Sequence, residues 1–223
     1  MTNRRHMIAR LAALLAATAT QGCFPWMFGD EGDDVVADTD TAADTEVGTC
    51  EDFGYWPDEV TIQDAAGIDQ LDGCMYVQGN VYIEQSQTLV DLDGLEWLVS
   101  IGGGLFVQDN ADLMSLAGLG SLFMVDLSIF INHNDALENV TGLDGLVAAG
   151  DSLFIEENPA LASLDGLGEL RFVGGDVAIR DNPALPTCEA EELVARLVAH
   201  GFTGEVTIAG NGAGDCDEPD GGL

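Results

Sequence analysis

The side chains that could do chemistry here are mostly carboxylates, since 40 Asp and Glu accompany only 6 basic residues, all of them arginine. Paired carboxylates can act as general acid and base or can hold calcium. Asp91, Asp93, Asp144 and Asp165 recur near predicted turns, but coincidence explains this recurrence better in so acidic a chain. His133 stands alone, and the sequence contains no His-x-x-x-His, Cys-x-x-Cys or glycine-rich phosphate-binding pattern. We therefore expect no catalytic residue, no metal-ligand set and no cofactor.

The formal net charge of −34 restricts the possible partners. Nucleic acid is excluded because the chain has too few basic residues to neutralise phosphates. The same charge favours solubility and attraction to basic partners.

Residues 1–22 have the order of a secretory signal peptide. Three arginines lie in the first ten residues, and residues 11–19 form an apolar run. This run is shorter than the roughly 20 residues that a membrane-spanning helix needs. We expect an exported protein.

Cys23 is the candidate lipidation site. Gly22-Cys23 resembles the end of a bacterial lipobox, which implies a diacylglycerol on Cys23 and a mature chain that begins there. The aromatic residues in 24–28 suit a membrane interface. The alternative is ordinary cleavage after residues 17–19, which would leave Cys23 as a free thiol. Phe24 is not the aspartate that retains some lipoproteins in the inner membrane, which favours the outer membrane or cell surface.

Residues 23–49 are expected to be a disordered, acidic tether. Residues 29–49 contain eight acids and no base, so charge repulsion should keep the segment extended. Residues 217–223 are expected to form an acidic tail.

Between these segments, residues 50–216 contain an internal repeat. Residues 79–102, 103–126, 127–150 and 151–174 are four consecutive units of 24 residues. Apolar third and fifth positions in each unit predict a half-buried strand. Leucine or valine recurs at positions 11, 14, 17 and 20, and glycine recurs at position 16. Each position should stack into a continuous row, which gives an all-β, right-handed parallel β-helix with 24-residue coils. The glycines should mark backbone with positive φ or without room for a side chain.

A short helix should close the C-terminal end of this solenoid. Thr187 is a plausible N-cap for a helix that ends before Gly201. Its expected apolar face comprises Leu193, Val194, Leu197 and Val198.

Four cysteines remain besides Cys23, and four cysteines allow three pairings. Only neighbouring coils touch in a linear solenoid, so we expect Cys50–Cys74 and Cys188–Cys216, one bridge at each end.

The eighth position of the units contains a row of asparagines. After Ser86 the row reads Asn110, Asn134, Asn158, Asn182 and Asn211. Asparagines after strands predict an internal ladder in which side-chain amides bond to turn backbone.

The fourth position contains a row of aromatic residues between two inward-facing positions. It reads Tyr82, Phe106, Phe130 and Phe154, followed by Ala178 and Thr207. An exposed aromatic stripe suits a sugar, peptide or protein partner. The alternatives are that the rings only stabilise adjacent strands, or that the tether or the capping helix covers them.

The segment 74–83 reads Cys-Met-Tyr-Val-Gln-Gly-Asn-Val-Tyr-Ile, and 161–170 reads Leu-Ala-Ser-Leu-Asp-Gly-Leu-Gly-Glu-Leu. With the Val-Gly-Gly-Asp-Val-Ala-Ile of 173–179, these segments resemble the receptor L domain, the β-helical ligand-binding domain of insulin and epidermal growth factor receptors, and above all its versions on exported bacterial lipoproteins. The resemblance implies a binding module without catalytic residues. We expect a monomeric, non-enzymatic envelope lipoprotein that binds a protein, peptide or glycan. A structural envelope protein and a polysaccharide-active β-helix enzyme are the alternatives.

Overall fold

The computed structural model describes residues 50 and 54–214. The predicted signal peptide, tether and acidic tail lie outside the described residues, and so do Cys23 and Cys216. No helix in the described part of the chain is both long enough and apolar enough to cross a membrane.

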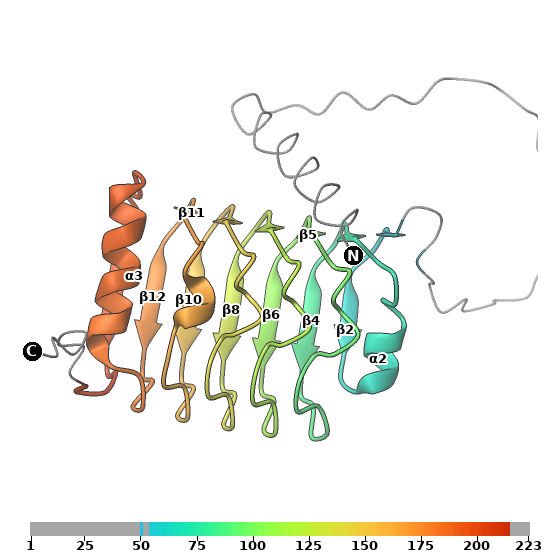
Figure 1. Cartoon of the computed structure of the whole chain (residues 1–223), viewed down its shortest axis with the longest axis horizontal. Helices are drawn as coiled ribbons and strands as arrows, with labels where there is room; N and C mark the ends of the chain where they lie inside the picture. Colours follow the sequence, from blue (N-terminus) through green and yellow to red (C-terminus); the bar gives the residue numbers. More distant parts are fainter. Residues whose placement is uncertain (1–49, 51–53, 215–223) are drawn as a thin grey trace, which may run out of the picture. The chain divides into compact units, whose positions relative to one another are not determined.

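Two parallel sheets run along the solenoid (Figure 1). The six-stranded sheet, called sheet A here, comprises β1 (Tyr55–Trp56), β3 (Tyr76–Val77), β5 (Ser100–Ile101), β7 (Met124–Val125), β9 (Ala148–Ala149) and β11 (Phe172–Val173). The seven-stranded sheet, called sheet B, comprises β2 (Val60–Ile62), β4 (Val81–Glu84), β6 (Leu105–Gln108), β8 (Ile129–Asn132), β10 (Leu153–Glu156), β12 (Val177–Arg180) and β13 (Val206–Ala209). The all-β solenoid predicted from the sequence is confirmed.

The strand register confirms the repeat length. From β4 to β12 in sheet B each residue pairs with the residue 24 positions later, as Val81 does with Leu105. The last step, from Val177 on β12 to Val206 on β13, is 29 residues because helix α3 (Thr187–Ala199) is inserted there.

The leucine, valine and isoleucine rows form one continuous core. Third- and fifth-position residues such as Leu105 and Val107 have no exposed surface, and neither have Leu113, Leu116 and Leu119 in the coil that follows. Each such burial stabilises the fold by about 1.5–3 kcal/mol. Because one coil contributes only one layer of this core, the coils are stable only when stacked.

The glycine row at position 16 meets both predicted conditions. Gly118 and Gly142 have φ of 108° and 106°, and a Cβ on either would lie 1.9 Å from a carbonyl oxygen of the preceding coil. Gly166 lies in the short 3-10 helix η1 (Asp165–Leu167) without a positive φ, yet its Cβ would lie 2.0 Å from Val140 O. A Cβ on Gly94 would lie 2.5 Å from the Ile68 side chain, so the lack of room for a side chain is common to all four glycines, whereas a positive φ is not.

Helix α3 caps the C-terminal end, but two details of the prediction are wrong. The N-cap position is Pro186, without a side-chain cap, and Thr187 is the first helical residue, with its hydroxyl donating to Gly212 O at 2.9 Å. Val198 is 55% exposed, whereas Leu193 and Leu197 are fully buried. The buried stripe follows the i, i+3, i+7 spacing of Ala190, Leu193 and Leu197, which turns Val198 away from the core.

The N-terminal end has a cap that the sequence did not reveal. Helix α2 (Ala65–Asp69) lies beside β2, and the Asp64 carboxylate accepts a hydrogen bond from Gly67 N at 3.1 Å. Buried Ile68 joins the core from this helix. The predicted Cys50–Cys74 disulfide is confirmed, with a Cα–Cα distance of 5.4 Å. Cys188 is also disulfide-bonded, and its predicted partner Cys216 lies outside the described residues.

Candidate binding face

The aromatic row, meaning Tyr82, Phe106, Phe130 and Phe154, lies on the outer face of sheet B. Each ring comes from the second residue of its strand, and each strand alternates buried and half-buried side chains. The strand register places the rings side by side across β4, β6, β8 and β10. The row is therefore outward-facing and half-buried, as its place between inward residues predicts.

The rings stack on one another. Neighbouring centroids lie 4.8, 5.1 and 4.9 Å apart along the row, with interplanar angles of 19°, 7° and 27°. Rings stacked face to face direct their edges to solvent. The row is accordingly a ridge of ring edges and differs from the broad platform of ring faces on which a sugar would stack.

Backbone and amide groups hold the first ring of the ridge. Asn80 donates from its side-chain amide to the Tyr82 hydroxyl at 2.9 Å and accepts from Gly104 N at 2.8 Å. Gly104 leaves room for the next ring, because a Cβ there would lie 2.8 Å from the Phe106 ring. Asn80 and Gly104, each two residues before a ring, thus help to position Tyr82 and Phe106.

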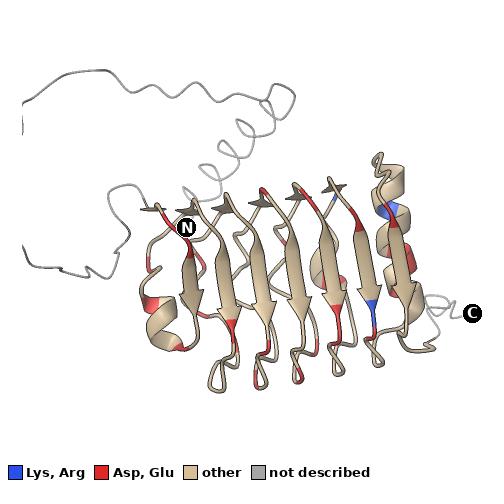
Figure 2. Cartoon of the chain, turned by 180° about the vertical axis from the view of Figure 1, so that it is seen from behind, with Lys and Arg blue, Asp and Glu red and all other residues tan. Residues whose placement is uncertain are grey.

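A polar row flanks the ridge two residues later on each strand. It comprises Glu84, Gln108, Asn132, Glu156 and Arg180. Arg180 binds Glu156 with two hydrogen bonds, Nε to Oε1 at 2.7 Å and Nη2 to Oε2 at 3.0 Å. The hydrogen bonding of Arg180 to Glu156 and the negative charge of this carboxylate raise the pKa of Arg180. Figure 2 shows the outer face of sheet B, and no described helix lies over it.

The asparagine row forms a buried ladder immediately after the strands. Asn134 Nδ2 donates to Val107 O at 2.9 Å and to Asn158 Oδ1 at 3.1 Å, and the same bonds recur along the row. From Asn110 to Asn182 the asparagines have no exposed surface, so their amides satisfy the turn backbone within the solenoid. The ladder has a structural role.

The residue before each ladder position has a left-handed backbone, which the sequence analysis missed. Gln85, Asp109, His133, Glu157 and Asp181 have φ between 56° and 58°. Gly210 occupies the same position in the last coil with φ of 69°. Gly210 is the residue from which the sequence could have predicted the left-handed backbone at this position, since glycine adopts this conformation most easily.

The other candidate residues have local roles. His133 Nε2 lies 2.8 Å from Glu157 Oε2 on neighbouring coils. Asp91 and Asp144 accept hydrogen bonds from backbone N–H groups two residues away, at 3.2 and 2.8 Å, and so close turns. Within residues 50 and 54–214 no group of three or more His, Cys, Asp or Glu could hold a metal ion.

Tyr76 and Asp126 lie on the other side of the solenoid, along sheet A. Burial raises the pKa of Asp126. Burial, followed by the negative charge of Asp126 and the proximity of Tyr55, raises the pKa of Tyr76. Tyr55 and Tyr76 stack with their centroids 5.7 Å apart. Partial burial therefore makes the ionised form of each of these two groups less favourable.

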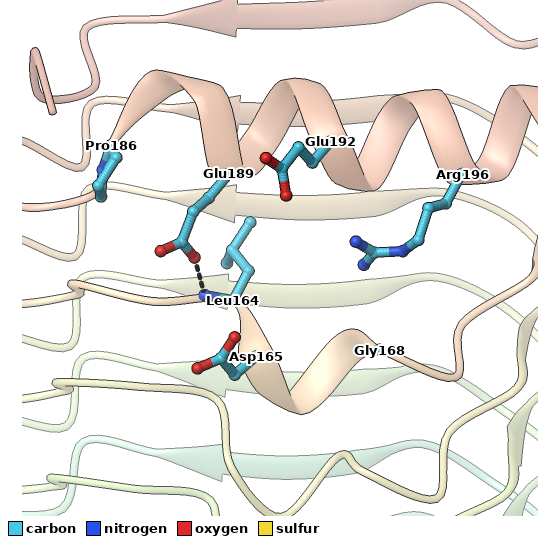
Figure 3. A pocket seen from close by; sticks show the side chains of 7 residues that line it. All are labelled: Leu164, Asp165, Gly168, Pro186, Glu189, Glu192 and Arg196. Atoms are coloured by element: carbon cyan, nitrogen blue, oxygen red, sulfur yellow. Dashed lines mark hydrogen bonds between the residues drawn. The ribbon is translucent and has the colours of Figure 1, made fainter. Parts of the chain in front are cut away.

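A groove of about 330 Å³ separates η1 from α3 (Figure 3). It is lined by Leu164, Asp165, Gly168, Pro186, Glu189, Glu192 and Arg196. Glu189 accepts a hydrogen bond from Leu164 N at 2.7 Å, and Arg196 donates to Leu167 O at 3.4 Å. Both side chains tie the capping helix to the last full coil, which is a structural role that the sequence did not indicate.

No family model, no curated protein and no solved structure matches this chain.

Proposed function

We propose that this chain is a non-enzymatic envelope lipoprotein whose solenoid recognises a partner through the outer face of sheet B. The partner is a protein, a peptide or a glycan. The resemblance to receptor L domains and the signal-like N-terminus support the proposal from the sequence.

The observation that carries the proposal is the ridge of half-buried rings on a sheet face that no described element covers. Phe106, Phe130 and Phe154 place apolar edges on that face, beside a polar row. Contiguous apolar surface rimmed by polar side chains is typical of interaction sites. An apolar ridge with a polar border can bury its rings while the border fixes the orientation of the partner.

A structural envelope role is the second candidate, and the ring stacking favours it. Stacked aromatic pairs on adjacent strands contribute about 0.5–1.5 kcal/mol each beyond the area they bury. The row therefore stabilises four coils whether or not it binds a partner. The two functions differ in what the loss of rings would change, namely partner capture or only stability.

The test is capture of a partner from envelope and extracellular extracts, with the chain and its Phe106→Ser/Phe130→Ser variant as baits. The matched control is Phe172→Ser, which removes a 56% exposed ring from the outer face of sheet A. Circular dichroism must show that both variants remain folded at the temperature of the experiment.

Loss of one specific partner by the sheet B variant alone, followed by direct binding of that purified partner to the chain, supports a binding module. Equal capture by all three baits rules out the outer face of sheet B. Capture by none, together with a lower melting temperature for the sheet B variant, favours the structural role.

Lipid anchoring at Cys23 is tested separately. Metabolic labelling with a radioactive fatty acid should label the chain and should fail to label Cys23→Ser. Labelling of neither would support ordinary cleavage and a free thiol at this position.

A further inference from the structure

The last strand of sheet B has an open edge. β13 pairs with β12 on one side, and no described strand pairs with its other side (Figure 2). A strand edge of this kind presents backbone N–H and C=O groups to which another strand can bind. The edge of β13 is therefore a candidate interaction surface that is distinct from the outer face of the sheet.

The backbone donors that join one coil to the next lack acceptors at this edge. In the preceding coil the N–H groups of Val177 and Asp181 donate to carbonyls of the last coil at 2.9 and 2.8 Å. The equivalent donors of the last coil are the N–H groups of Val206 and Gly210, and neither binds an acceptor in the part of the chain that the structure describes. Both residues are exposed. The edge thus carries two accessible donors at the positions by which earlier coils bind their successors.

The asparagine ladder also ends open here. Asn182 N donates to Asn211 Oδ1 at 3.2 Å, as earlier members of the row do to their successors. The backbone N–H of Asn211 has no acceptor among the described residues. A strand that carried a side-chain oxygen at the equivalent position would add one more rung to the ladder.

Two apolar rows reach the edge uncovered. Val206 continues the row of Val177 but is 43% exposed, against 1% for Val177. Ile208 is half-buried, whereas Ile179 beside it has no exposed surface. Helix α3 therefore caps the last coil without covering Val206, and an added strand could bury an apolar side chain against each row.

Charge favours a basic partner over a second copy of this chain. Glu205 at the start of the edge is exposed and forms no ion pair with a described residue. Two copies, each with a formal net charge of −34, would repel each other. A head-to-tail contact would also need open apolar rows on β2, where Val60 and Ile62 are only 4% and 0% exposed. A basic segment of another protein meets neither obstacle.

We propose that the open edge of β13 binds an extended, basic segment of a partner protein as an added strand of sheet B, parallel to β13. Carbonyls of the segment accept from Val206 and Gly210, and its own N–H groups donate to β13. Apolar side chains lie against Val206 and Ile208, and an asparagine or aspartate lies against Asn211. The ladder contact requires the parallel direction. The site does not include the aromatic row, so it does not rest on the proposed function.

The probe is a fluorescent, acetylated peptide amide with the sequence Lys-Val-Lys-Ile-Lys-Gly-Asn, which matches these requirements. Its binding to the chain is measured by fluorescence anisotropy. One comparison peptide has glutamate in place of each lysine, and another has an N-methyl group on the second lysine, opposite Thr207. The N-methyl peptide keeps every charge but cannot donate to β13, so it should bind about tenfold or more weakly. The glutamate peptide should show a similar loss or no binding.

Equal binding by the N-methyl peptide would overturn strand addition, and equal binding by the glutamate peptide would overturn the preference for a basic segment. Hydrogen exchange locates the contact. The amides of Val206 and Gly210 should exchange more slowly when the peptide is bound. Unchanged exchange at both amides would place the peptide elsewhere and refute the site.

Two variants at one position form a matched pair. Val206→Pro removes a donor that binds no described group, and proline is tolerated where a strand edge is open. Val206→Thr keeps the N–H and the branched shape. Both should give the circular dichroism spectrum of the chain. Val206→Pro should weaken the peptide about tenfold or more, and Val206→Thr should change its affinity by less than about threefold. Equal affinity for the two variants would refute the hydrogen bond from Val206.

The remaining outcomes separate this site from its alternatives. Self-association of the chain in sedimentation, abolished by Val206→Pro, would make a second copy the occupant and overturn the basic partner. Phe106→Ser/Phe130→Ser should bind the peptide as tightly as the chain does. If that variant loses an extract partner but keeps the peptide, both proposals stand, and if it keeps both, only the outer face of sheet B is ruled out.

Discussion

Asn134 Oδ1 accepts two hydrogen bonds from Asn110, one from its backbone N–H at 3.2 Å and one from its side-chain amide at 3.0 Å. Each asparagine repeats this relationship with the asparagine of the next coil. The ladder consequently couples neighbouring coils through groups that have no access to water. Removing one member should leave several buried polar groups unpaired at once.

Asn134→Ala should lower the free energy of unfolding by about 2–4 kcal/mol. The substitution removes the side chain that accepts from the backbone N–H of Asn110 and donates to the carbonyl of Val107, and both groups are buried. Urea titration followed by circular dichroism measures the loss. Asn132→Ala in the same coil is the control. The buried Oδ1 of Asn132 has no hydrogen-bond partner among the described residues, so the loss of this side chain should cost under about 1 kcal/mol. Equal losses in the two variants would contradict a structural ladder.

Gly142→Ala should destabilise the solenoid by more than about 3 kcal/mol, because the new Cβ would meet Leu116 O at 1.9 Å on backbone with φ of 106°. Thermal melting measures the effect. Gly120→Ala is the matched control, since a Cβ there has no heavy atom within 4 Å. Its melting temperature should stay the same or rise, and a drop as large as that of Gly142→Ala would contradict the close-approach explanation.

Gln85→Gly should stabilise the fold or leave it unchanged, which is unusual for a glycine substitution. Gln85 holds φ of 57°, a conformation that costs a residue with a side chain about 1 kcal/mol. Glycine removes that cost but loses a similar amount of chain entropy in folding. The control Gln87→Gly, at an exposed position with no positive φ, should lose about 0.5–1 kcal/mol. Chemical denaturation measures the change in the free energy of unfolding for both variants. A loss for Gln85→Gly as large as that for Gln87→Gly would contradict the expected relief of strain.

Asp126→Asn should stabilise the protein at neutral pH and not in acid. Burial raises the folded-state pKa of Asp126 above its usual 3.8, so the folded state binds this proton more tightly than the unfolded state does. The ionised carboxylate therefore costs stability at pH values above its folded pKa, and the cost disappears below the unfolded pKa. Melting temperatures of the chain and the variant should converge as the pH falls below 3.8. A difference in melting temperature that persisted in this acidic range would mean that packing, and not the charge of Asp126, causes the effect.

Cys50→Ala should lower the free energy of unfolding by about 3 kcal/mol, because the bridge to Cys74 closes a loop with a sequence separation of 24 residues. Cys74 would remain as a buried, small apolar side chain, so the core at this end should be kept. Denaturation under non-reducing conditions leaves the disulfide at Cys188 unaffected and isolates this effect. An unchanged midpoint would mean that α2 and the core close the N-terminal end without the bridge.

The repeat made much of this structure predictable, because a side chain at a given position meets its counterpart in every neighbouring coil. Alternation placed Val107 inside and Phe106 outside, and the constant spacing of 24 residues put Phe106 beside Phe130. The asparagine row and the Cys50–Cys74 pairing follow from the same translation along the solenoid. The two ends were less predictable, since α2 and the phase of α3 have no counterpart in the repeat.

The sequence by itself determined which side chains share a row and which rows face the core. Only the tertiary structure decided how the side chains of a row contact one another, because the distances between neighbouring coils depend on how the coils stack. The strand separation turned the aromatic row into a stack that shows its ring edges. The turn after each strand required a left-handed residue at Glu157 and its equivalents. The carboxylate of Glu189 acquired its role only when α3 docked against Leu164, which lies 25 residues earlier in the chain.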